Sequence, residues 1–359
     1  MQRKLVTYVE PQFHTDRLGL LTPQGILDLT LAHAAVLAAA GDPRPQARAQ
    51  MELPTSMLDF LRAGESALAA LDGVVAWYAS RQGMESALRG PAGERLLYPH
   101  PGTRLRAPVP RPGKIIHTAG NFREHAREGS EGGWDFQIPP WISFLKCTSA
   151  IIGDGDPILY PRITQKLDHE IELGIIIGKA GRYIPAERAW EHIAGFTVFN
   201  DVTARDVQRR EMKSGLLNLG KNLDTFATFG PCMTLRDDIG DVHALKIELR
   251  VNGDPRQISS TAKLSVRIPE IVSHWSVMSL EPGDIISTGT VSGVAAFRPD
   301  PTAYWLKPGD VVECEIENIG TTRNVVVRDE LTADQEEWLR RREHLFAADL
   351  QDEYRAKPA

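Results

Sequence analysis

Near the N-terminus, the alternation of hydrophobic and polar positions predicts strands first and helices afterwards. KLVTYV and RLGLLT are typical of two short strands, with a turn at 23–25. Apolar residues at three- and four-residue spacing then predict helices over 26–40 and 56–80, joined by the polar connection GDPRPQARAQ. Five prolines in LLYPHPGTRLRAPVPRPGK, residues 96–114, mark the best candidate for a linker.

After this linker, over about residues 115–325, the chain consists mostly of short β-rich runs broken by Gly, Pro, Asn and Asp. RVNGDP, residues 250–255, is a hairpin turn signal. The pattern L-x-P-G-D occurs at 280–284 and at 306–310, and each copy leads into an apolar run, which is typical of a turn before a strand. The charged segment 332–356 predicts an amphipathic helix that docks on the body or on a partner subunit.

These patterns predict a protein of the α+β class, mostly β, in four parts. The parts are a small N-terminal α/β domain of strands and helices (1–105), a Pro-rich linker (106–114), a β-rich domain (115–330) and a C-terminal amphipathic helix or tail (331–359). A chain of 359 residues is long enough to bury a large core.

Composition and charge narrow the class of protein. With 42% hydrophobic and 25% charged residues the chain is ordinary for a globular protein, and a net charge of −6 argues against non-specific nucleic-acid binding. No apolar stretch approaches the roughly 20 residues of a membrane span, and the start has no hydrophobic region typical of a signal peptide. The scattered Cys147, Cys232 and Cys314 are expected in the core and favour a reducing, cytoplasmic location.

The segment LDHEIELGIIIG, residues 167–178, places Glu170 and Glu172 inside an apolar run. In a strand both would share one face, and the isoleucines that follow predict a strand buried on both sides. Asp201 follows another apolar run, so a third carboxylate can complete a cluster. Clustered carboxylates need a cation, and oxygen ligands favour Mg²⁺, Mn²⁺ or Ca²⁺. The alternative is a strand with one solvated, charged face.

Another candidate lies in HTAGNFREHAREG, residues 117–129, where His125 and Glu128 are one helical turn apart. A carboxylate there can orient the imidazole ring and raise its basicity, so that the ring can accept a proton from water. A charged pair on a surface helix is the alternative.

Two lysines and one loop add further candidates. Lys146 and Lys221 lie in segments with turn chemistry, and either can stabilise an enolate or oxyanion beside a metal or be an ordinary surface lysine. The loop GTVSGV, residues 289–294, offers backbone N–H groups to a carboxylate, or is an ordinary tight turn.

Six ordered segments over about residues 113–325 carry a resemblance to a known family. In chain order they are GNFREHAREG, FLKCTSAIIGDGDPI, LDHEIELGIIIGK, FNDVTARDVQ, GKNLDTFATFGP and LEPGDIISTGTVSGV. Together they closely resemble the motifs of the fumarylacetoacetate hydrolase superfamily, in a larger bacterial-type member with an N-terminal domain. The resemblance implies a catalytic domain built as a roll of mixed β-sheets, usually dimeric.

The resemblance also implies a role for each candidate residue. The implied divalent-metal ligands are Glu170, Glu172 and Asp201. The implied catalytic residues, with the first two as a dyad on a lid helix, are His125, Glu128, Lys221 and Lys146. The implied substrate-binding residues are Arg205, Gln208 and Thr290.

Four departures from the family pattern leave the implied ligands and dyad in place. Cys147 stands where proline is common, Val291 where proline is frequent, and Asn222 where a small serine is usual. The lid sequence SEGGWDFQ, residues 130–137, is unusual. Because lid and loops shape the pocket, the identity of the substrate stays open.

The implied chemistry is the formation of an enolate from a 2-oxo acid or a 1,3-diketone. A divalent ion, Mg²⁺ or else Mn²⁺ or Ca²⁺, polarises the carbonyl, while His125 and Glu128 activate the water that breaks a C–C bond. We therefore expect a metal-dependent hydrolase of an acylpyruvate-like or β-diketone substrate in aromatic catabolism. It would be a cytoplasmic homodimer that binds neither nucleic acid nor membrane. The alternatives are a decarboxylase, hydratase/dehydratase or tautomerase of the same superfamily, or a non-catalytic binding protein.

Overall fold

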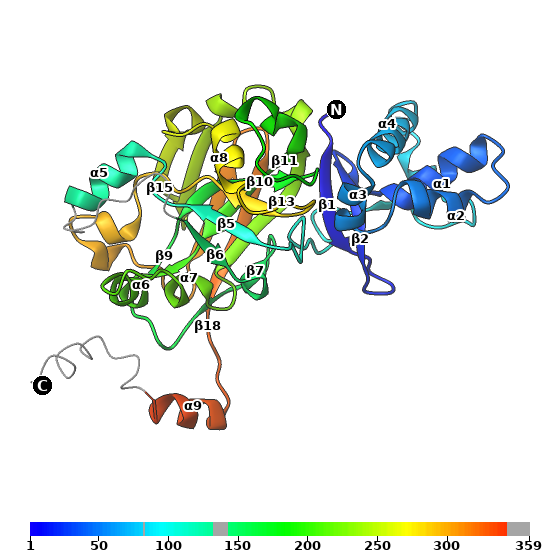
Figure 1. The fold of residues 1–359 in the computed structure, drawn as a ribbon. Helices are drawn as coiled ribbons and strands as arrows, with labels where there is room; N and C mark the ends of the chain where they lie inside the picture. The colour runs from blue at the N-terminus through cyan, green and yellow to red at the C-terminus, as the bar shows by residue number, and fades with distance from the viewer. Residues whose placement is uncertain (82, 132–142, 343–359) are drawn as a thin grey trace, which may run out of the picture.

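The computed structural model of the protein describes residues 1–81, 83–131 and 143–342. Within these residues, the chain forms a large sheet, a second sheet and a short two-stranded ladder, with helices around them (Figure 1). The predicted class, α+β and mostly β, is confirmed.

The large sheet has 11 strands and runs through the whole body. Its main path, in spatial order, is β4 (Leu97–Tyr98), β3 (Gly25–Asp28), β2 (Asp16–Thr22), β1 (Lys4–Val9), β13 (Ala227–Leu235), β11 (Ile193–Asp201), β10 (Ile171–Ile177), β16 (Ile285–Ser287), β5 (Ile115–Thr118) and β6 (Ser143–Lys146), with β7 (Ile151–Ile152) beside β13. The pairing of β1 with β13 joins the N-terminal strands to the rest of the sheet. The division between residues 1–105 and the later domain stays a prediction, and this strand pair crosses it.

The second sheet packs against the large one. In spatial order it contains β15 (Asp254–Ser260), β14 (Lys246–Val251), β17 (Val311–Ile316), β18 (Gly320–Arg328) and β8 (Ile158–Tyr160), while the two-stranded ladder is β12 (Thr203–Ala204) with β9 (Leu167–Asp168). The predicted hairpin is confirmed, since Asn252 and Gly253 both have positive φ between β14 and β15. The two L-x-P-G-D turns lead into β16 and β17, as expected.

Helices cover both parts of the molecule (Figure 1). They are α1 (Leu29–Ala39), α2 (Pro45–Glu52), α3 (Met57–Ala63), α4 (Glu65–Ala79), α5 (Arg123–Glu131), α6 (Arg205–Met212), α7 (Leu219–Asn222), α8 (Ile268–Trp275) and α9 (Ala333–Arg340). The short 3-10 helices of the chain include η4 (Arg236–Asp238), η6 (Thr261–Lys263) and η7 (Ala295–Phe297). The helices α1, α3 and α4 share an apolar cluster with the N-terminal strands, whereas Ala49 of α2 packs against Ala34 and Leu37 of α1.

Three predictions for the N-terminal helices were wrong in detail. The helix expected over 26–40 begins only at Leu29, because residues 25–28 form β3 and Asp28 then caps α1 by accepting from the Leu31 backbone. The helix expected over 56–80 is divided into α3 and α4 at Gly64, whose φ is 60°. The supposed polar connection holds α2, which begins at Pro45.

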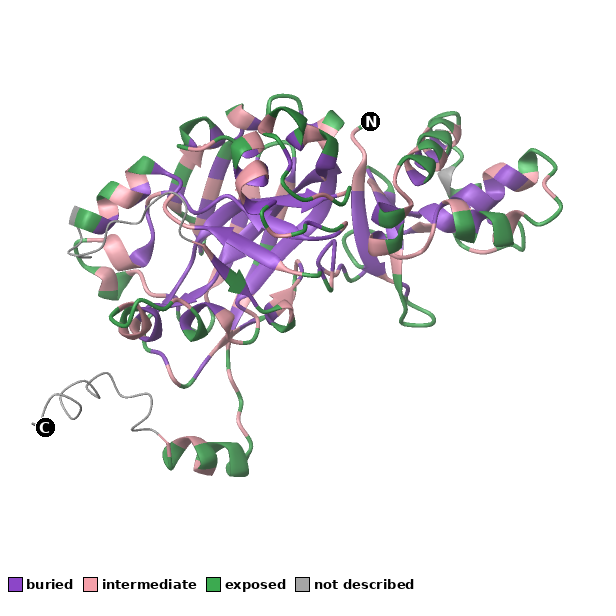
Figure 2. Ribbon diagram, viewed as in Figure 1, coloured by how far each residue is buried: buried purple, intermediate pink, exposed green. Residues whose placement is uncertain are grey.

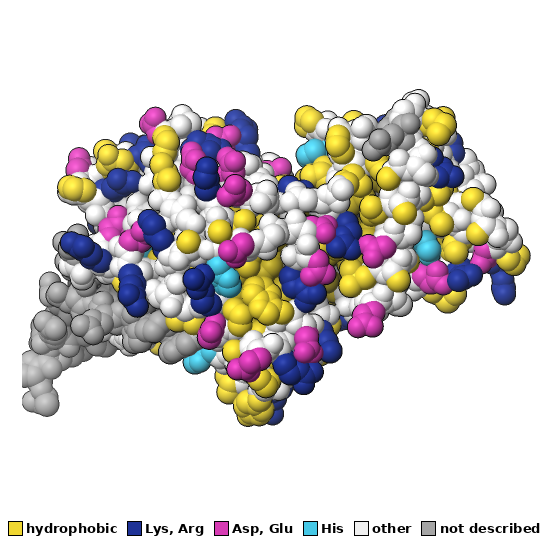
Figure 3. Space-filling view, turned by 90° about the horizontal axis from the view of Figure 1, so that it is seen from above, with side chains coloured by type: hydrophobic (Ala, Val, Ile, Leu, Met, Phe, Trp, Pro, Cys, Tyr) yellow, Lys and Arg dark blue, Asp and Glu magenta, His cyan; other side chains and the backbone are white. Residues whose placement is uncertain are grey.

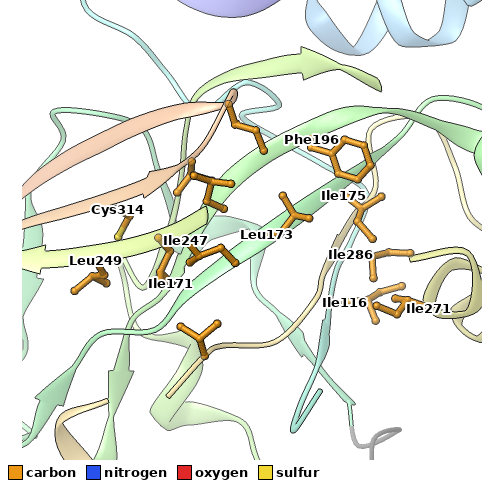
Figure 4. Close-up of a cluster of buried hydrophobic side chains, with 14 of the residues drawn as sticks. Ile116, Ile171, Leu173, Ile175, Phe196, Ile247, Leu249, Ile271, Ile286 and Cys314 are labelled. Carbon is orange, nitrogen blue, oxygen red and sulfur yellow. The ribbon is translucent and has the colours of Figure 1, made fainter. Parts of the chain in front are cut away.

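The strand β10 lies between β11 and β16 and is buried on both faces, as predicted. Ile171 and Leu173 lie on the side of Ile247 and Leu249 of the second sheet, whereas Ile175 lies beside Phe196 and Ile286 (Figure 4). Ile176, on the opposite face, belongs to the apolar cluster that includes the N-terminal helices. Figure 2 shows this buried interior running through the sheets. Burying an isoleucine side chain contributes roughly 1.5–3 kcal/mol, so these contacts fix the register of β10 firmly.

The helix α9 contacts the body less than the sequence led us to expect. None of its residues is buried, and an ion pair of 3.0 Å joins Arg162 Nη2 to Glu336 Oε1 (Figure 1). Docking on a partner subunit stays a prediction. The rest of the predicted segment, from 343 onward, lies outside the described residues.

Two of the three cysteines lie in the core, as the sequence predicted. Cys232 and Cys314 are buried as predicted, but Cys147 is exposed, because it directly follows the sheet-edge strand β6. Among the described helices, none combines the length and the apolar character that crossing a bilayer demands. On the face seen from above, acidic and basic side chains are interspersed (Figure 3).

Candidate active site

Four neighbouring strands of the large sheet bring polar side chains to one buried place. Asp201 ends β11, Glu172 lies on β10, Ser287 ends β16 and His117 lies on β5. His117 Nδ1 is 3.3 Å from Glu172 Oε2 and 3.6 Å from Asp201 Oδ2, and the Ser287 hydroxyl donates to the same Glu172 oxygen. Side chains on adjacent strands converge in this way because the sheet register places them on one face.

Two buried lysines compensate the negative charge of these carboxylates. Lys146, at the end of β6, donates to Asp201 Oδ1. Lys221, on α7, donates to Glu170 Oε2 and to Asp201 Oδ2, at 2.7 Å in each case. The surface alternative is therefore excluded for both lysines, since neither is more than 3% exposed.

Glu170 lies in the same pocket but pairs with cationic side chains. Arg205 Nη2 is 2.5 Å from Glu170 Oε1, and Arg205 Nε donates to Asp168 Oδ2 at 2.7 Å. Asp168 also accepts from the backbone N–H groups of Ala295 and Ala296, so it holds Arg205 and the η7 segment together. The alternative of a solvated strand face for Glu170 and Glu172 is wrong, because both are buried.

The mutual influence of these charges shifts the pKa values in the cluster. Burial raises the pKa of Glu172 well above its ordinary value, and the neighbouring charges of Asp201 and Glu170 raise it further. Burial alone would also raise the pKa of Asp201, but Lys146 and Lys221 outweigh burial and lower it. Burial lowers the pKa of His117 to about 3, so its imidazole is neutral near pH 7.

The donor set fits a divalent cation. One ligand atom each from His117, Glu172 and Asp201 lies within 4.8 Å of the other two, and all three residues are buried. Two carboxylates and a neutral imidazole are ordinary metal ligands, and a cation between them would relieve the carboxylate repulsion. Glu170 is not part of this converging group among the described residues, and its role as a ligand stays a prediction.

His125 and Glu128 face each other on α5 but are not hydrogen-bonded. His125 Nδ1 and Glu128 Oε2 are 3.7 Å apart, and Nδ1 has no hydrogen-bond partner among the described residues. Both Glu128 oxygens accept from the Gly293 backbone N–H, at 3.0 and 2.9 Å. The His125 ring instead packs on Phe297, with ring centroids 5.1 Å apart. The two residues predicted from the sequence therefore lie close together, and Nδ1 of His125 has no hydrogen-bond partner among the described residues.

The helix α5 is fastened at its N-terminal end. Glu124 accepts from Ser259 Oγ at 2.5 Å and from Lys263 Nζ at 2.6 Å, which ties α5 to the end of β15 and to η6. The Val266 backbone N–H donates to Asn121 Oδ1 at 2.8 Å just before the helix. These contacts set the position of His125 over the pocket. The unusual lid sequence lies partly outside the described residues, from 132 onward.

A single pocket gathers eight of the ten residues predicted for the site. They are His125, Glu170, Glu172, Asp201, Arg205, Gln208, Lys221 and Thr290. Glu128 and Lys146 lie behind this lining, in contact with Gly293 and Asp201 respectively. The Thr290 hydroxyl donates to the Ile171 carbonyl and accepts from Gln257 Nε2, so it is occupied by the protein itself.

Sequence reasoning missed His117, and the pocket also includes Phe144 and Phe297. The available signal was a single histidine inside the apolar run KIIHT. Its importance depends on the parallel pairing of β5 with β16, which places His117 opposite Ser287.

Comparison with known proteins agrees with this geometry. Residues 114–327 match the model of the fumarylacetoacetate (FAA) hydrolase C-terminal domain. The chain belongs to the fumarylacetoacetate hydrolase family. It is 40% identical to the mitochondrial oxaloacetate tautomerase FAHD2A of Bos taurus over 278 residues, which cover 77% of this chain and 81% of that relative.

Solved structures of the family extend the similarity to the whole fold. Maleylpyruvate hydrolase from Sphingobium sp. SYK-6, in complex with manganese(II) ion and pyruvate, is 28% identical with a TM-score of 0.64, covering 91% of this chain and 100% of its own. The 5-carboxymethyl-2-hydroxymuconate delta-isomerase from Mycobacterium smegmatis is 37% identical with a TM-score of 0.55, covering 65% and 86%. The family therefore includes relatives named for tautomerisation, hydrolysis and isomerisation.

Proposed function

We propose that the protein interconverts the keto and enol forms of a 2-oxo acid with the help of a divalent ion. The observation that carries the proposal is the position of His125, whose Nδ1 has no hydrogen-bond partner among the described residues, over a pocket that holds buried Lys221 and Arg205. Enol formation needs a group that takes a proton from carbon and positive charge that stabilises the oxygen.

The ion would be held by the carboxylates of Glu172 and Asp201, with Glu170 as the further ligand predicted from the sequence. When bound, Mg²⁺, Mn²⁺ or Ca²⁺ supplies Lewis acidity that polarises a carbonyl and stabilises negative charge on its oxygen. The buried, converging oxygens support this assignment, and so does the manganese(II) in the Sphingobium relative.

The protein's own residues supply the proton transfer. His125 takes a proton from the carbon next to the carbonyl, and the C–H electron pair becomes the C=C bond of the enol. The carbonyl oxygen gains a proton in turn, so the reaction is an isomerisation that consumes no water. Lys221, which contacts both Glu170 and Asp201 and lines the pocket, stabilises the oxygen, while Arg205 and Gln208 on α6 bind a carboxylate of the substrate.

Hydrolysis of a C–C bond is the second candidate, and a specific contact favours it. His125 and Glu128 are 3.7 Å apart, so a small movement would give the dyad that activates water. The similarity to maleylpyruvate hydrolase over 91% of the chain supports the same reaction. We place it second because Gly293 engages both Glu128 oxygens and the bovine relative is named as a tautomerase.

The proposal extends to the setting of the enzyme. We propose that it acts as a homodimer in the cytoplasm on a small oxo acid or diketone from aromatic catabolism, without nucleic-acid or membrane partners. Its net charge of −6 supports the absence of nucleic acid. The bovine relative is named as mitochondrial, so localisation by microscopy or fractionation is the relevant test.

Product analysis separates the two reactions. The enzyme with Mg²⁺ or Mn²⁺ is mixed with oxaloacetate or with acylpyruvates, and products are identified by NMR. We expect keto–enol interconversion without change in mass, and a loss of about 100-fold or more in kcat/KM for His125→Ala. Two acids formed in equal amounts from an acylpyruvate, with no catalysed interconversion of oxaloacetate, would favour the second candidate. No turnover of any of these substrates would contradict both.

A further inference from the structure

His117 is a buried histidine that the proposed proton transfer does not use. It is 1% exposed, and its ring is fixed by stacking on Phe144 at 4.7 Å and by an edge contact with Phe199 at 5.0 Å between centroids. Its Nε2 has no hydrogen-bond partner among the described residues. A buried polar ring with an unsatisfied nitrogen is costly unless it has a further role.

The other ring nitrogen points at the carboxylates. Nδ1 is 3.3 Å from Glu172 Oε2 and 3.6 Å from Asp201 Oδ2. In an octahedral site with bonds of about 2.1 Å, neighbouring ligand atoms are about 3 Å apart. The two separations from Nδ1 are within a few tenths of an ångström of that value, and the ligand atoms of all three residues lie within 4.8 Å of one another.

In the part of the chain that the structure describes, the lysine and arginine side chains around the cluster form no ion pair or hydrogen bond with His117 or Glu172. Lys146 and Lys221 both contact Asp201, and Arg205 lies on Glu170. Glu172 accepts from the neutral Ser287 hydroxyl and has no ion pair with a lysine or arginine among the described residues. An ion between His117 and Glu172 therefore meets one nitrogen and one carboxylate without first displacing a lysine from them.

We propose that His117 is a nitrogen ligand of the divalent ion, beside Glu172 and Asp201, and that it biases the site toward Mn²⁺ or Fe²⁺ over Mg²⁺ and Ca²⁺. An imidazole ligand adds little for the hard ions Mg²⁺ and Ca²⁺, which prefer oxygen, but strengthens binding of transition ions. This inference rests on the metal part of the proposed function and deepens it, since it names the class of ion and a ligand that the sequence did not.

Pulsed electron paramagnetic resonance of the full chain loaded with Mn²⁺ tests the ligand directly. We expect coupling of the metal to one histidine nitrogen, identified by the change in coupling when the chain is produced with ¹⁵N-histidine. His117→Phe keeps the ring packing and should abolish this coupling. His125→Ala, which removes the other pocket imidazole, should retain it.

Competition binding supplies the second readout. We expect His117→Phe to weaken Mn²⁺ binding by at least tenfold while Mg²⁺ binding changes less than threefold, so that the preference for Mn²⁺ falls. His117→Gln serves as a second variant if the phenylalanine variant does not fold. The spectrum of the ¹⁵N-histidine-labelled wild type tests for a histidine ligand without any variant.

The possible failures are distinguishable. Stoichiometric Mn²⁺ binding without histidine coupling in the wild type would overturn the role of His117 and leave the proposed function standing. Coupling that disappears in His125→Ala and persists in His117→Phe would also overturn it. No binding of Mn²⁺ or Mg²⁺ at all would overturn this inference together with the metal in the proposed function.

Discussion

At the scale of single residues, Gly289 shows how tightly the loop beside the pocket is built. Its φ is +89°, and an added Cβ would lie 2.5 Å from the Thr118 carbonyl oxygen, which is backbone and cannot move aside. Gly309 has a similar φ of +100°, but nothing lies within 4 Å of the added Cβ. A comparison of alanine substitutions at the two glycines therefore separates the cost of backbone strain from the cost of a steric clash.

We predict that Gly289→Ala is the more damaging of the two substitutions. Both variants incur the left-handed backbone penalty of roughly 1–2 kcal/mol, and only Gly289→Ala adds a clash. In denaturant unfolding we expect it to lose at least about 1 kcal/mol more than Gly309→Ala, with a fall in activity as Thr290 shifts. Equal losses in the two variants would show that the contact with Thr118 is not limiting.

The sequence predicts residues well where a local period or an ordered motif carries the information. The alternation in LDHEIELGIIIG places Glu170 and Glu172 on one face, and both line the pocket. His117 escaped prediction because its partners come from strands distant in sequence. The loop 289–294 was expected to offer backbone N–H groups to a carboxylate, and the Gly293 N–H does donate to one, but the sequence did not identify Glu128 as that carboxylate.

At the scale of elements, the segment before β1 is fastened to η4 by a salt bridge. Arg3 Nη2 donates to Asp238 Oδ1 at 2.9 Å, and Arg3 Nε donates to Oδ2 at 3.0 Å. Burial alone would raise the pKa of Asp238, but the hydrogen bonds from Arg3 outweigh burial and lower it. The carboxylate form is therefore favoured in the folded state.

This salt bridge predicts a dependence of stability on pH. Because the folded pKa of Asp238 is below the unfolded one, its stabilisation is present above the ordinary carboxyl pKa of about 4 and is lost as the pH falls through the folded pKa. The stability advantage of wild type over Asp238→Asn, about 1 kcal/mol at pH 7, should shrink progressively in urea unfolding as the pH falls below about 4. The adjacent, exposed Asp237 supplies the control Asp237→Asn. A wild-type advantage over Asp238→Asn that stays constant with pH would contradict the prediction.

Element boundaries were harder to predict than element types. The strands β1 and β2 follow from short apolar runs that end at a turn, and the doubly buried β10 follows from its continuous run of isoleucines. The break at Gly64 and the helix starting at Pro45 did not, because a single glycine or proline permits several local structures and tertiary packing selects one.

At the scale of the whole molecule, α9 gives a test of assembly. Trp338 is 51% exposed, and no residue of α9 is buried in the single chain. We predict a particle of twice 39.7 kDa in sedimentation, and a dimer weakened at least tenfold by Trp338→Ala, because a buried interface tryptophan contributes on the order of 2 kcal/mol. Met51→Ala, at another exposed hydrophobic residue, is the matched control. Equal dissociation of the two variants would exclude α9 from the interface.

The whole fold divides the candidate site between a rigid sheet and a helix outside it. Strands β11, β10, β16 and β5 supply the carboxylates and the imidazole from a rigid sheet, while α5 brings His125 from outside it. In the proposed reaction, charge stabilisation comes from the sheet and proton transfer from α5. The overall class was predictable because six ordered motifs span the sheet, whereas the substrate was not, because these motifs do not specify the loops that surround the pocket.

The central claim is that this pocket forms an enol from a 2-oxo acid with His125 as the proton carrier. It is tested most directly by NMR measurement of deuterium uptake from D₂O at the carbon next to the carbonyl of oxaloacetate. The account predicts uptake faster than the uncatalysed rate with metal-loaded wild type, and about 100-fold slower catalysis with His125→Ala. Uptake that never exceeds the uncatalysed rate, or catalysis that His125→Ala leaves unchanged, would contradict it.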